Sequence, residues 1–173
     1  MKKFRYIPLD FEIDKLTNSI ENTLSGEIFD TEITRLTYVE HYQIKKNDWL
    51  FDWHSELKNT NSEVYKFTTS NNPTIIHGLI SLTDKRDHVF MNLIENASFN
   101  KGSKKLYKGV MGNLVAFACK TAFEKRYDGV VSFIAKTQLI EHYQQTLGAK
   151  LFGESRMFID TAEASILVTQ YFK

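Results

Sequence analysis

The sequence predicts an α/β domain built on a mixed sheet. The first half carries β-type segments separated by turns, which is the pattern of an antiparallel meander. The second half alternates strand-like and helix-like segments, which is typical of strand–helix–strand–helix units. With 173 residues, 42% of them hydrophobic, the chain can bury a substantial core, and we expect one domain over residues 1–173.

The elements of the first half follow from the spacing of apolar residues. A helix is expected over Phe11–Leu24, because apolar residues recur on one helical face and Ser25-Gly26 follows. Strands are expected next where β-branched and aromatic residues dominate, at 31–39, 64–69 and 74–82. A polar hairpin at 83–87 then leads into a strand over 88–96. The segment 49–53 fits either a short helix or a strand.

The second half predicts alternating helices and strands. The first helix spans about 112–126, and a continuous apolar strand follows at 130–135. Thr137 is expected to cap a helix that runs to Leu147 and closes at Gly148. Short strands at 150–152 and 156–159 and a last helix over 161–171 complete the chain.

Composition narrows the classes of function. The formal net charge of +1 argues against nucleic acid as a partner. One cysteine, Cys119, suits a reducing compartment, and there is neither a secretory signal nor an apolar run of membrane-spanning length, so we expect a cytoplasmic protein without a membrane partner. The five histidines form no i, i+4 pair and no cluster with cysteine. We therefore expect no metal site.

A basic, glycine-containing loop lies between the strand at 88–96 and the helix that follows. It contains Gly109 and Gly112 and is preceded by several lysines between 101 and 108. A loop of this kind aims free backbone N–H groups and the positive end of the helix dipole at an anion. The segment therefore predicts phosphate binding, and the alternative is a solvated loop at an ordinary helix start.

Two motifs and their order resemble the GNAT superfamily of acyl-CoA-dependent N-acyltransferases, within a bacterial branch. Tyr107–Gly112 resembles the Arg/Gln-x-x-Gly-x-Gly/Ala loop of that superfamily, with Tyr107 in place of Arg/Gln. Lys136–Gly148 resembles its Asn-x-x-Ala-x-x-x-Tyr-x-x-x-Gly-Phe segment, with Tyr143 at the Tyr position and Lys136 in place of Asn. The resemblance extends from about His77 to Phe158, roughly half of the chain.

The resemblance implies a GNAT-like, mostly antiparallel central sheet flanked by helices. It also implies transfer of an acyl group, with acetyl-CoA as co-substrate, to an amine by direct attack. The acceptor would be a small-molecule or protein amine, and a homodimer is compatible with the sequence. The alternative is a catalytically inactive GNAT-like module that senses CoA or binds a protein.

The resemblance also assigns roles to individual residues. Glu95, at the end of the strand before the loop, would be the general base, and Tyr143 would be the general acid that protonates the departing sulfur. Their alternatives are a solvated strand-end carboxylate and a packing tyrosine. The aromatic residues around Asp52 would suit a wall for the amine, or else the core. The expected coenzyme-binding residues are Ile94, Tyr107, Lys108, Gly109, Val110, Met111, Gly112, Asn113 and Lys136.

Overall fold

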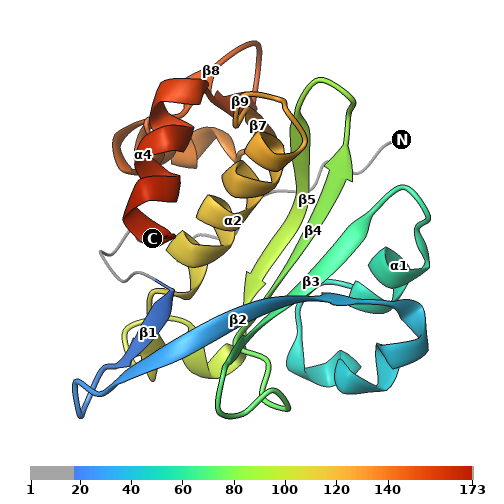
Figure 1. Cartoon of the computed structure of the whole chain (residues 1–173), viewed down its shortest axis with the longest axis vertical. Helices are drawn as coiled ribbons and strands as arrows, with labels where there is room; N and C mark the ends of the chain where they lie inside the picture. The colour runs from blue at the N-terminus through green and yellow to red at the C-terminus, as the bar shows by residue number, and fades with distance from the viewer. Residues whose placement is uncertain (1–17, 173) are drawn as a thin grey trace.

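The computed structural model describes residues 18–172, which form a nine-stranded sheet with helices packed against it (Figure 1). The strand order is β6-β1-β2-β3-β4-β5-β7-β9-β8. Among the strands of residues 18–172, only β5 and β7 pair in parallel, and every other neighbouring pair is antiparallel. The predicted α/β architecture with a mixed, mostly antiparallel sheet is therefore confirmed.

The elements have the following bounds. The strands are β1 (Ser19–Asn22), β2 (Ile28–Leu36), β3 (Glu63–Thr69), β4 (Gly78–Asp84), β5 (Val89–Asn96), β6 (Tyr107–Lys108), β7 (Val131–Ile134), β8 (Lys150–Leu151) and β9 (Arg156–Ile159). The helices are α1 (Trp53–Lys58), α2 (Val110–Glu124), α3 (Ile140–Leu147) and α4 (Thr161–Tyr171). Four 3-10 turns are η1 (Tyr38–Gln43), η2 (Lys46–Asp48), η3 (Ser98–Asn100) and η4 (Thr137–Leu139).

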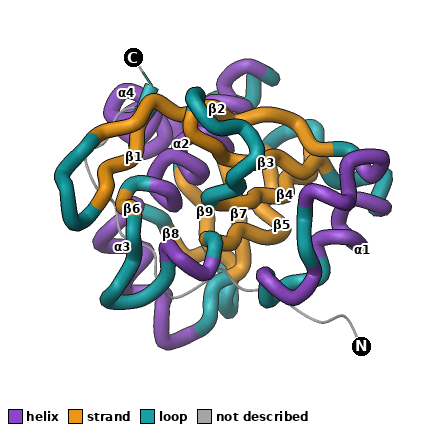
Figure 2. The backbone as a smooth tube through the Cα atoms, turned by 90° about the horizontal axis from the view of Figure 1, so that it is seen from below, coloured by secondary structure: helices purple, strands orange, loops and turns teal. Residues whose placement is uncertain are grey.

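Two hydrophobic clusters hold the helices against the sheet. The larger one joins the central strands to α2 and α4, and includes Ile80 and Leu114. The smaller one packs Leu79 and Leu93 against Trp53 of α1. Because successive residues of a strand point to opposite faces, Leu79 and Ile80 reach different clusters. Figure 2, which is turned by 90° from Figure 1, shows α2 and α4 together on one side and α1 apart from them.

A β-bulge in β5 changes which of its residues face which cluster. Ser81 pairs with Leu93 while Leu82 pairs with Met91, so Asn92 is the extra residue. Val89 and Met91 consequently face the α2 side, whereas Leu93 faces the α1 side. Regular alternation of the sequence would place all three on one face with Glu95. The bulge shows that this expectation does not hold, since the extra residue reverses the pattern.

Several expected elements differ from the structure. The part of the expected Phe11–Leu24 helix at 18–24 is a strand and a turn, and residues 11–17 lie outside the described residues. The strand expected at 74–82 begins at Gly78 and extends to Asp84. Thr137 begins η4 instead of capping a long helix, and α3 starts at Ile140. The segment 49–53 is mostly irregular and ends at the start of α1.

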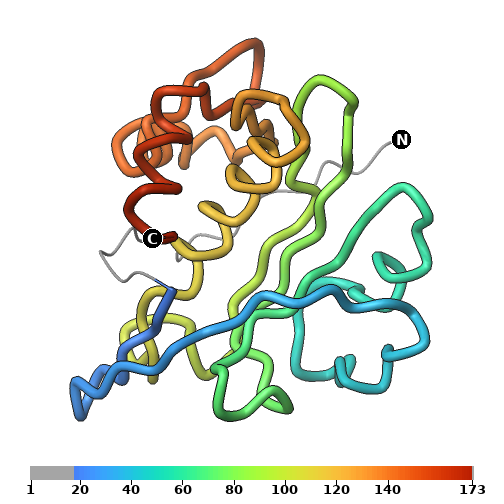
Figure 3. Tube along the Cα trace, in the orientation of Figure 1, coloured from blue at the N-terminus to red at the C-terminus, as the bar shows by residue number. Residues whose placement is uncertain are grey.

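Pairing with distant segments explains why 19–22 is a strand. β1 lies between β2 and β6, and Glu21 is opposite both Ile28 and Lys108. Figure 3 shows the blue β1 close to the yellow-green segment that follows β5. Helical periodicity is a local property, and here the ladder with two other strands overrides it.

Candidate functional site

The start of α2 presents unpaired backbone donors. Gly109 precedes the helix with φ +108° and ψ −10°, in the left-handed region that favours glycine. The N–H groups of Val110, Met111 and Gly112 are the first three of the helix, so the helix itself offers them no carbonyl acceptor. The 15-residue helix adds the positive end of its dipole at the same point. This geometry suits an anion such as phosphate.

Asn113 braces the start of α2. Its backbone N–H donates to the Gly109 carbonyl at 3.2 Å, and its side-chain Nδ2 donates to the same carbonyl at 2.7 Å and to the Ser19 carbonyl at 3.1 Å. Asn113 is also buried, with 1% of its surface exposed. The backbone N–H of Asn113 is bonded within the helix. The donors at the start of α2 that remain available to an anion are therefore the N–H groups of Val110, Met111 and Gly112.

Gly112 has a packing role that its place in the motif does not reveal. A Cβ atom at this position would lie 2.2 Å from Oη of Tyr171 in α4. The missing side chain thus allows α2 and α4 to approach each other closely. A substitution of Gly112 would disturb the fold before it tested phosphate binding, so Gly109 is the cleaner position for such a test.

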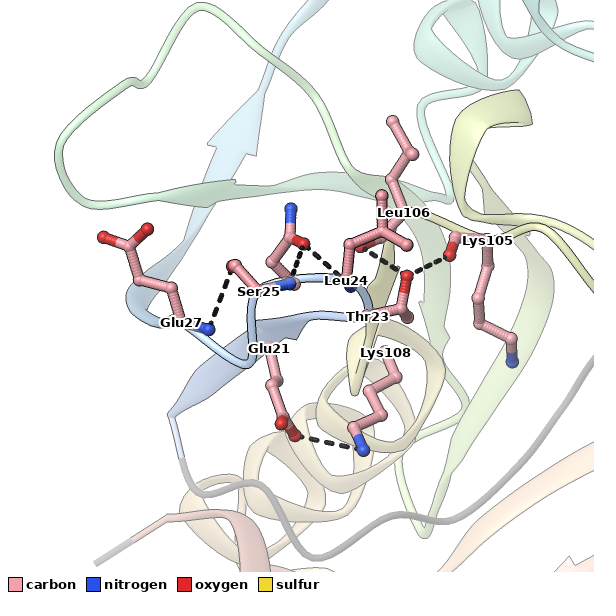
Figure 4. Close-up of polar contacts among 9 residues, drawn as sticks. Glu21, Thr23, Leu24, Ser25, Glu27, Lys105, Leu106 and Lys108 are labelled. Atoms are coloured by element: carbon pink, nitrogen blue, oxygen red, sulfur yellow. Dashed lines mark hydrogen bonds and ion pairs between the residues drawn. The ribbon is translucent and has the colours of Figure 1, made fainter.

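The β1–β2 hairpin supports the loop that leads into α2 (Figure 4). Lys108 forms an ion pair with Glu21 at 3.1 Å, and the side chain of Thr23 donates to the Lys105 carbonyl at 2.7 Å. The Asn22 side chain accepts from two N–H groups of the hairpin turn. Lys108, expected to help bind phosphate, is therefore half-exposed and already held by a carboxylate.

A buried histidine supports the same loop from the other side. The Asn100 side chain accepts from the Tyr107 N–H at 3.2 Å, which turns its amide nitrogen toward Nδ1 of His77, also at 3.2 Å. Nδ1 must then accept, so the imidazole is neutral with its proton on Nε2. The His77 ring also packs edge-on against Tyr107, with centroids 4.9 Å apart. Burial lowers the pKa of His77 to about 4.

We expect this histidine to make the fold sensitive to acid. Below pH 6.5, the ordinary pKa of histidine, the unfolded chain binds a proton at His77. In the folded protein, His77 binds this proton only near its lowered pKa of about 4. The unfolding free energy should therefore fall as the pH drops through this window, by about 2 kcal/mol between about pH 7 and pH 5. Chemical denaturation of the protein and of His77→Gln, which cannot titrate, measures the difference. Equal losses in the two proteins would contradict the expectation.

The two parallel strands β5 and β7 pair over a short stretch only. β5 and β7 pair only at Val89 with Val131 and at Phe90 with Ser132. Along the rest of β5, no residue of β7 pairs with it within the described chain. β7 therefore leaves the backbone of β5 near Ile94 unpaired, and the side chain of Ile94 is itself buried in the core. Lys136 lies just beyond β7 and is exposed.

Glu95 lies near the end of β5 and is fully buried. Its carboxylate accepts from the N–H groups of Leu50 at 2.8 Å and Phe51 at 3.1 Å, and from the Trp53 indole at 3.0 Å. Lys101 completes the set with an ion pair at 2.9 Å. The exposed fraction of the Glu95 residue is 0%. The role of general base remains a prediction, and the alternative of a solvated carboxylate is excluded.

Tyr143 lies in α3 and is also fully buried. Its ring packs edge-on against Phe133 of β7, with centroids 5.5 Å apart. Burial raises the pKa of Tyr143 above its ordinary value, so the phenol stays protonated at neutral pH. The role of Tyr143 as general acid remains a prediction.

A cavity of about 310 Å³ opens beside the end of β5. One wall comes from the segment 43–49 and includes Trp49 and Asp48, and the other combines residues 74–76 with the segment 97–99, which includes Ser98 and Phe99. Asp52, by contrast, caps α1: its carboxylate accepts from both the hydroxyl and the N–H of Ser55, which lowers its pKa. Of the aromatic segment around Asp52, Trp53 belongs to the core and Trp49 lines the cavity.

The side chains and helices of residues 18–172 do not support a metal site, a cysteine nucleophile or a membrane span. No group of three or more His, Cys, Asp or Glu side chains is arranged to hold a metal in this part of the chain. Cys119 is buried in the core, and burial raises the pKa of its thiol to about 12, which is unsuited to a nucleophile. Within the same residues, every helix is too short or too polar to span a bilayer.

The fold of this chain is similar to that of several solved structures. Compared by sequence, the chain matches no protein-family model and no curated protein. By structure it is similar to AtaTR bound with AcCoA (TM-score 0.52, 18% identity, 80% of this chain and 98% of that one covered). It is also similar to a chimera of the spermidine N-acetyltransferase SpeG from Vibrio cholerae and hSSAT (0.51, 12%, 78% and 98%).

A third similar structure is a GNAT family acetyltransferase from Elizabethkingia anophelis with acetyl-CoA bound (TM-score 0.50, 16% identity, 71% of this chain and 78% of that one covered). The chain therefore has the GNAT fold, and the expectation drawn from the two sequence motifs is confirmed for the fold. Identities below 20% do not carry the acceptor or the activity of those proteins to this chain.

Proposed function

We propose that the protein is an acyl-CoA-dependent N-acyltransferase that uses acetyl-CoA as the acyl donor and a primary amine as the acceptor. The observation that carries the proposal is the start of α2, where three N–H groups without a carbonyl acceptor in the helix lie close to the end of β5, along which β7 does not pair. Structural neighbours that hold acetyl-CoA support the class of co-substrate.

Different residues would bind the coenzyme and promote the reaction. Val110, Met111 and Gly112 would donate their N–H groups to the diphosphate of the coenzyme. The open edge of β5 near Ile94 would hold the pantetheine arm, which directs the thioester toward the end of the sheet. Holding both substrates in line supplies much of the rate. The deprotonated amine attacks the thioester carbon, the carbon–sulfur bond breaks, and Tyr143 would donate a proton to the departing thiolate. The new amide nitrogen loses its extra proton to solvent, and solvent returns a proton to the Tyr143 phenol.

Thiol release tests the proposal. The protein is incubated with acetyl-CoA and a panel of primary amines, including a polyamine, an arylalkylamine and a lysine peptide, and free thiol is followed over time. We expect thiol release that depends on one class of amine and exceeds hydrolysis without amine. Absence of amine-dependent release across the panel, in a protein that binds acetyl-CoA, would contradict the proposed activity.

One observation favours a second candidate, a module that senses CoA without catalysis. Both predicted catalytic side chains, Glu95 and Tyr143, have no exposed surface. The fold alone does not imply catalysis. If the protein only senses CoA, acetyl-CoA raises its melting temperature but no amine is acylated. If the protein is an acyltransferase, acetyl-CoA raises the melting temperature and an amine is acylated.

A further inference from the structure

We infer that Glu95 is a positioning residue, which holds together the two walls of the pocket that receives the acceptor amine. The inference rests on the proposed acyl transfer for the identity of the occupant. The pocket is the cavity of about 310 Å³ lined by the segment 43–49 on one side and by residues 74–76 and the turn with Ser98 and Phe99 on the other. The Glu95 carboxylate accepts hydrogen bonds from the N–H groups of Leu50 and Phe51, which follow the segment 43–49. It also accepts from Lys101, which follows the turn with Ser98 and Phe99.

The acceptor capacity of the Glu95 carboxylate is filled. A carboxylate offers about four lone-pair sites. Oε1 accepts from Phe51 N–H and the Trp53 indole, and Oε2 accepts from Leu50 N–H and Lys101. A general base must come within hydrogen-bond distance of the proton it removes. Here no lone pair and no exposed surface remain for an incoming amine.

The same contacts explain how a buried charge is tolerated at this point. An ionised carboxylate away from water is strongly unfavourable unless it is paired and fully hydrogen-bonded. Lys101 supplies the opposite charge, and its own side chain is 24% exposed, so it reaches Glu95 from the surface. The two backbone N–H groups belong to an irregular segment that makes no other ladder at these positions. Glu95 therefore fixes a segment that the sheet does not fix.

The bonded segments continue directly into the pocket walls. Trp49, which lines the pocket, precedes Leu50 and Phe51. Phe99, which lines the opposite side, is two residues before Lys101. The carboxylate thus links one wall to the other across the end of β5. Loosening this link should change the shape of the pocket and leave the start of α2 unaffected.

Glu95→Gln is the first test, because it keeps the size of the side chain but turns an amide N–H₂ toward groups that are themselves donors. We expect hydrogen exchange of the Leu50 and Phe51 amides to accelerate at least about tenfold, since these amides lose a charged acceptor. The dissociation constant for acetyl-CoA should stay within about twofold of the parent, because the 109–112 backbone is unchanged. Unchanged exchange at Leu50 and Phe51 would overturn the inference.

Acceptor binding is read with a probe, 2-phenylethylamine, through tryptophan fluorescence. The chain has two tryptophans, at 49 and 53, and both belong to this region. We expect the parent to respond to the probe at millimolar concentration, and Glu95→Gln to require at least about tenfold more probe, a loss of about 1.4 kcal/mol. A parent without a response would overturn the assignment of the pocket. A variant that binds the probe as the parent does would overturn the role of Glu95.

Lys101→Met provides a second variant in case Glu95→Gln does not fold. It removes the charge that joins the far wall and keeps the aliphatic stem. Lys125→Met is the control, because Lys125 also forms one ion pair, with Asp84 at 3.5 Å at the opposite end of β4, and its side chain is 34% exposed. We expect weaker probe binding only in Lys101→Met. Equal behaviour of the two lysine variants would contradict the inference.

The pH dependence of turnover separates positioning from proton transfer. If Glu95 positions the wall, Glu95→Gln raises the KM for the amine at least about tenfold, and its pH–rate profile keeps the shape of the parent profile. Loss of the acidic limb of the profile with an unchanged KM would identify Glu95 as the base and overturn the inference. Exchange and probe binding do not require turnover, so failure of the proposed activity would be recognised separately.

Discussion

Gly109→Ala is expected to weaken the binding of acetyl-CoA at least about tenfold. At φ +108° an alanine is strained by roughly 1–3 kcal/mol, and the backbone can relieve the strain only by rotating the N–H groups at the start of α2. A rotation of these donors away from the diphosphate costs binding energy, and about 1.4 kcal/mol corresponds to a factor of ten. Isothermal titration calorimetry with acetyl-CoA measures the change directly.

Gly153→Ala is the matched control for this variant. Gly153 follows β8 with φ +96°, and a Cβ atom added there meets no atom within 4 Å. The substitution therefore introduces comparable backbone strain far from α2. We expect a similar loss of stability in the two variants and a loss of acetyl-CoA affinity only in Gly109→Ala. Parental affinity in Gly109→Ala would show that the loop does not hold the diphosphate.

Tyr143→Phe is expected to lower the turnover number about ten- to a thousandfold, a reduction that overlaps the range typical of general acid catalysis. The variant keeps the ring that packs against Phe133 and removes only the hydroxyl. Because the proton is needed only as the thiolate departs, the loss should appear in kcat, with acetyl-CoA affinity preserved. Steady-state thiol release and calorimetry together separate the two quantities.

The control for Tyr143 is another tyrosine with a bonded hydroxyl. Tyr127→Phe removes a hydroxyl that donates to Asp84 at 2.7 Å, near the hairpin between β4 and β5. This variant should turn over like the parent. If Tyr143→Phe also does so, Tyr143 is a packing residue, and the CoA-sensing alternative or catalysis by proximity alone becomes the better account.

Much of the fold could be predicted because its elements have strong local patterns. The apolar run 130–135 forms β7, and the periodic segment 161–171 forms α4 with the predicted bounds. Gly148 closes α3 in the left-handed conformation, as its place after Leu147 indicates. In each case local propensity and burial favour the same structure, so the sequence pattern is sufficient.

The errors arise where distant contacts override local pattern. Helical spacing at 18–24 gives way to a strand because β2 and β6 pair on either side of it. The bulge at Asn92 reverses the faces of β5 and turns Glu95 toward α1, which period-two alternation cannot anticipate. His77 and Asn100 support the loop before α2 from 30 and 7 residues before Tyr107, respectively, and no local signal in the sequence identifies them.

The central claim is that the start of α2 binds the diphosphate of an acyl-CoA, and one calorimetric comparison tests it most directly. Acetyl-CoA and S-acetylpantetheine share the thioester and the pantetheine arm, but only acetyl-CoA carries the diphosphate and the nucleotide. We predict that acetyl-CoA binds at least about a hundredfold more tightly, a difference of about 2.7 kcal/mol, and that Gly109→Ala narrows this difference. Equal affinity for the two thioesters, or a difference that Gly109→Ala leaves unchanged, would contradict the account.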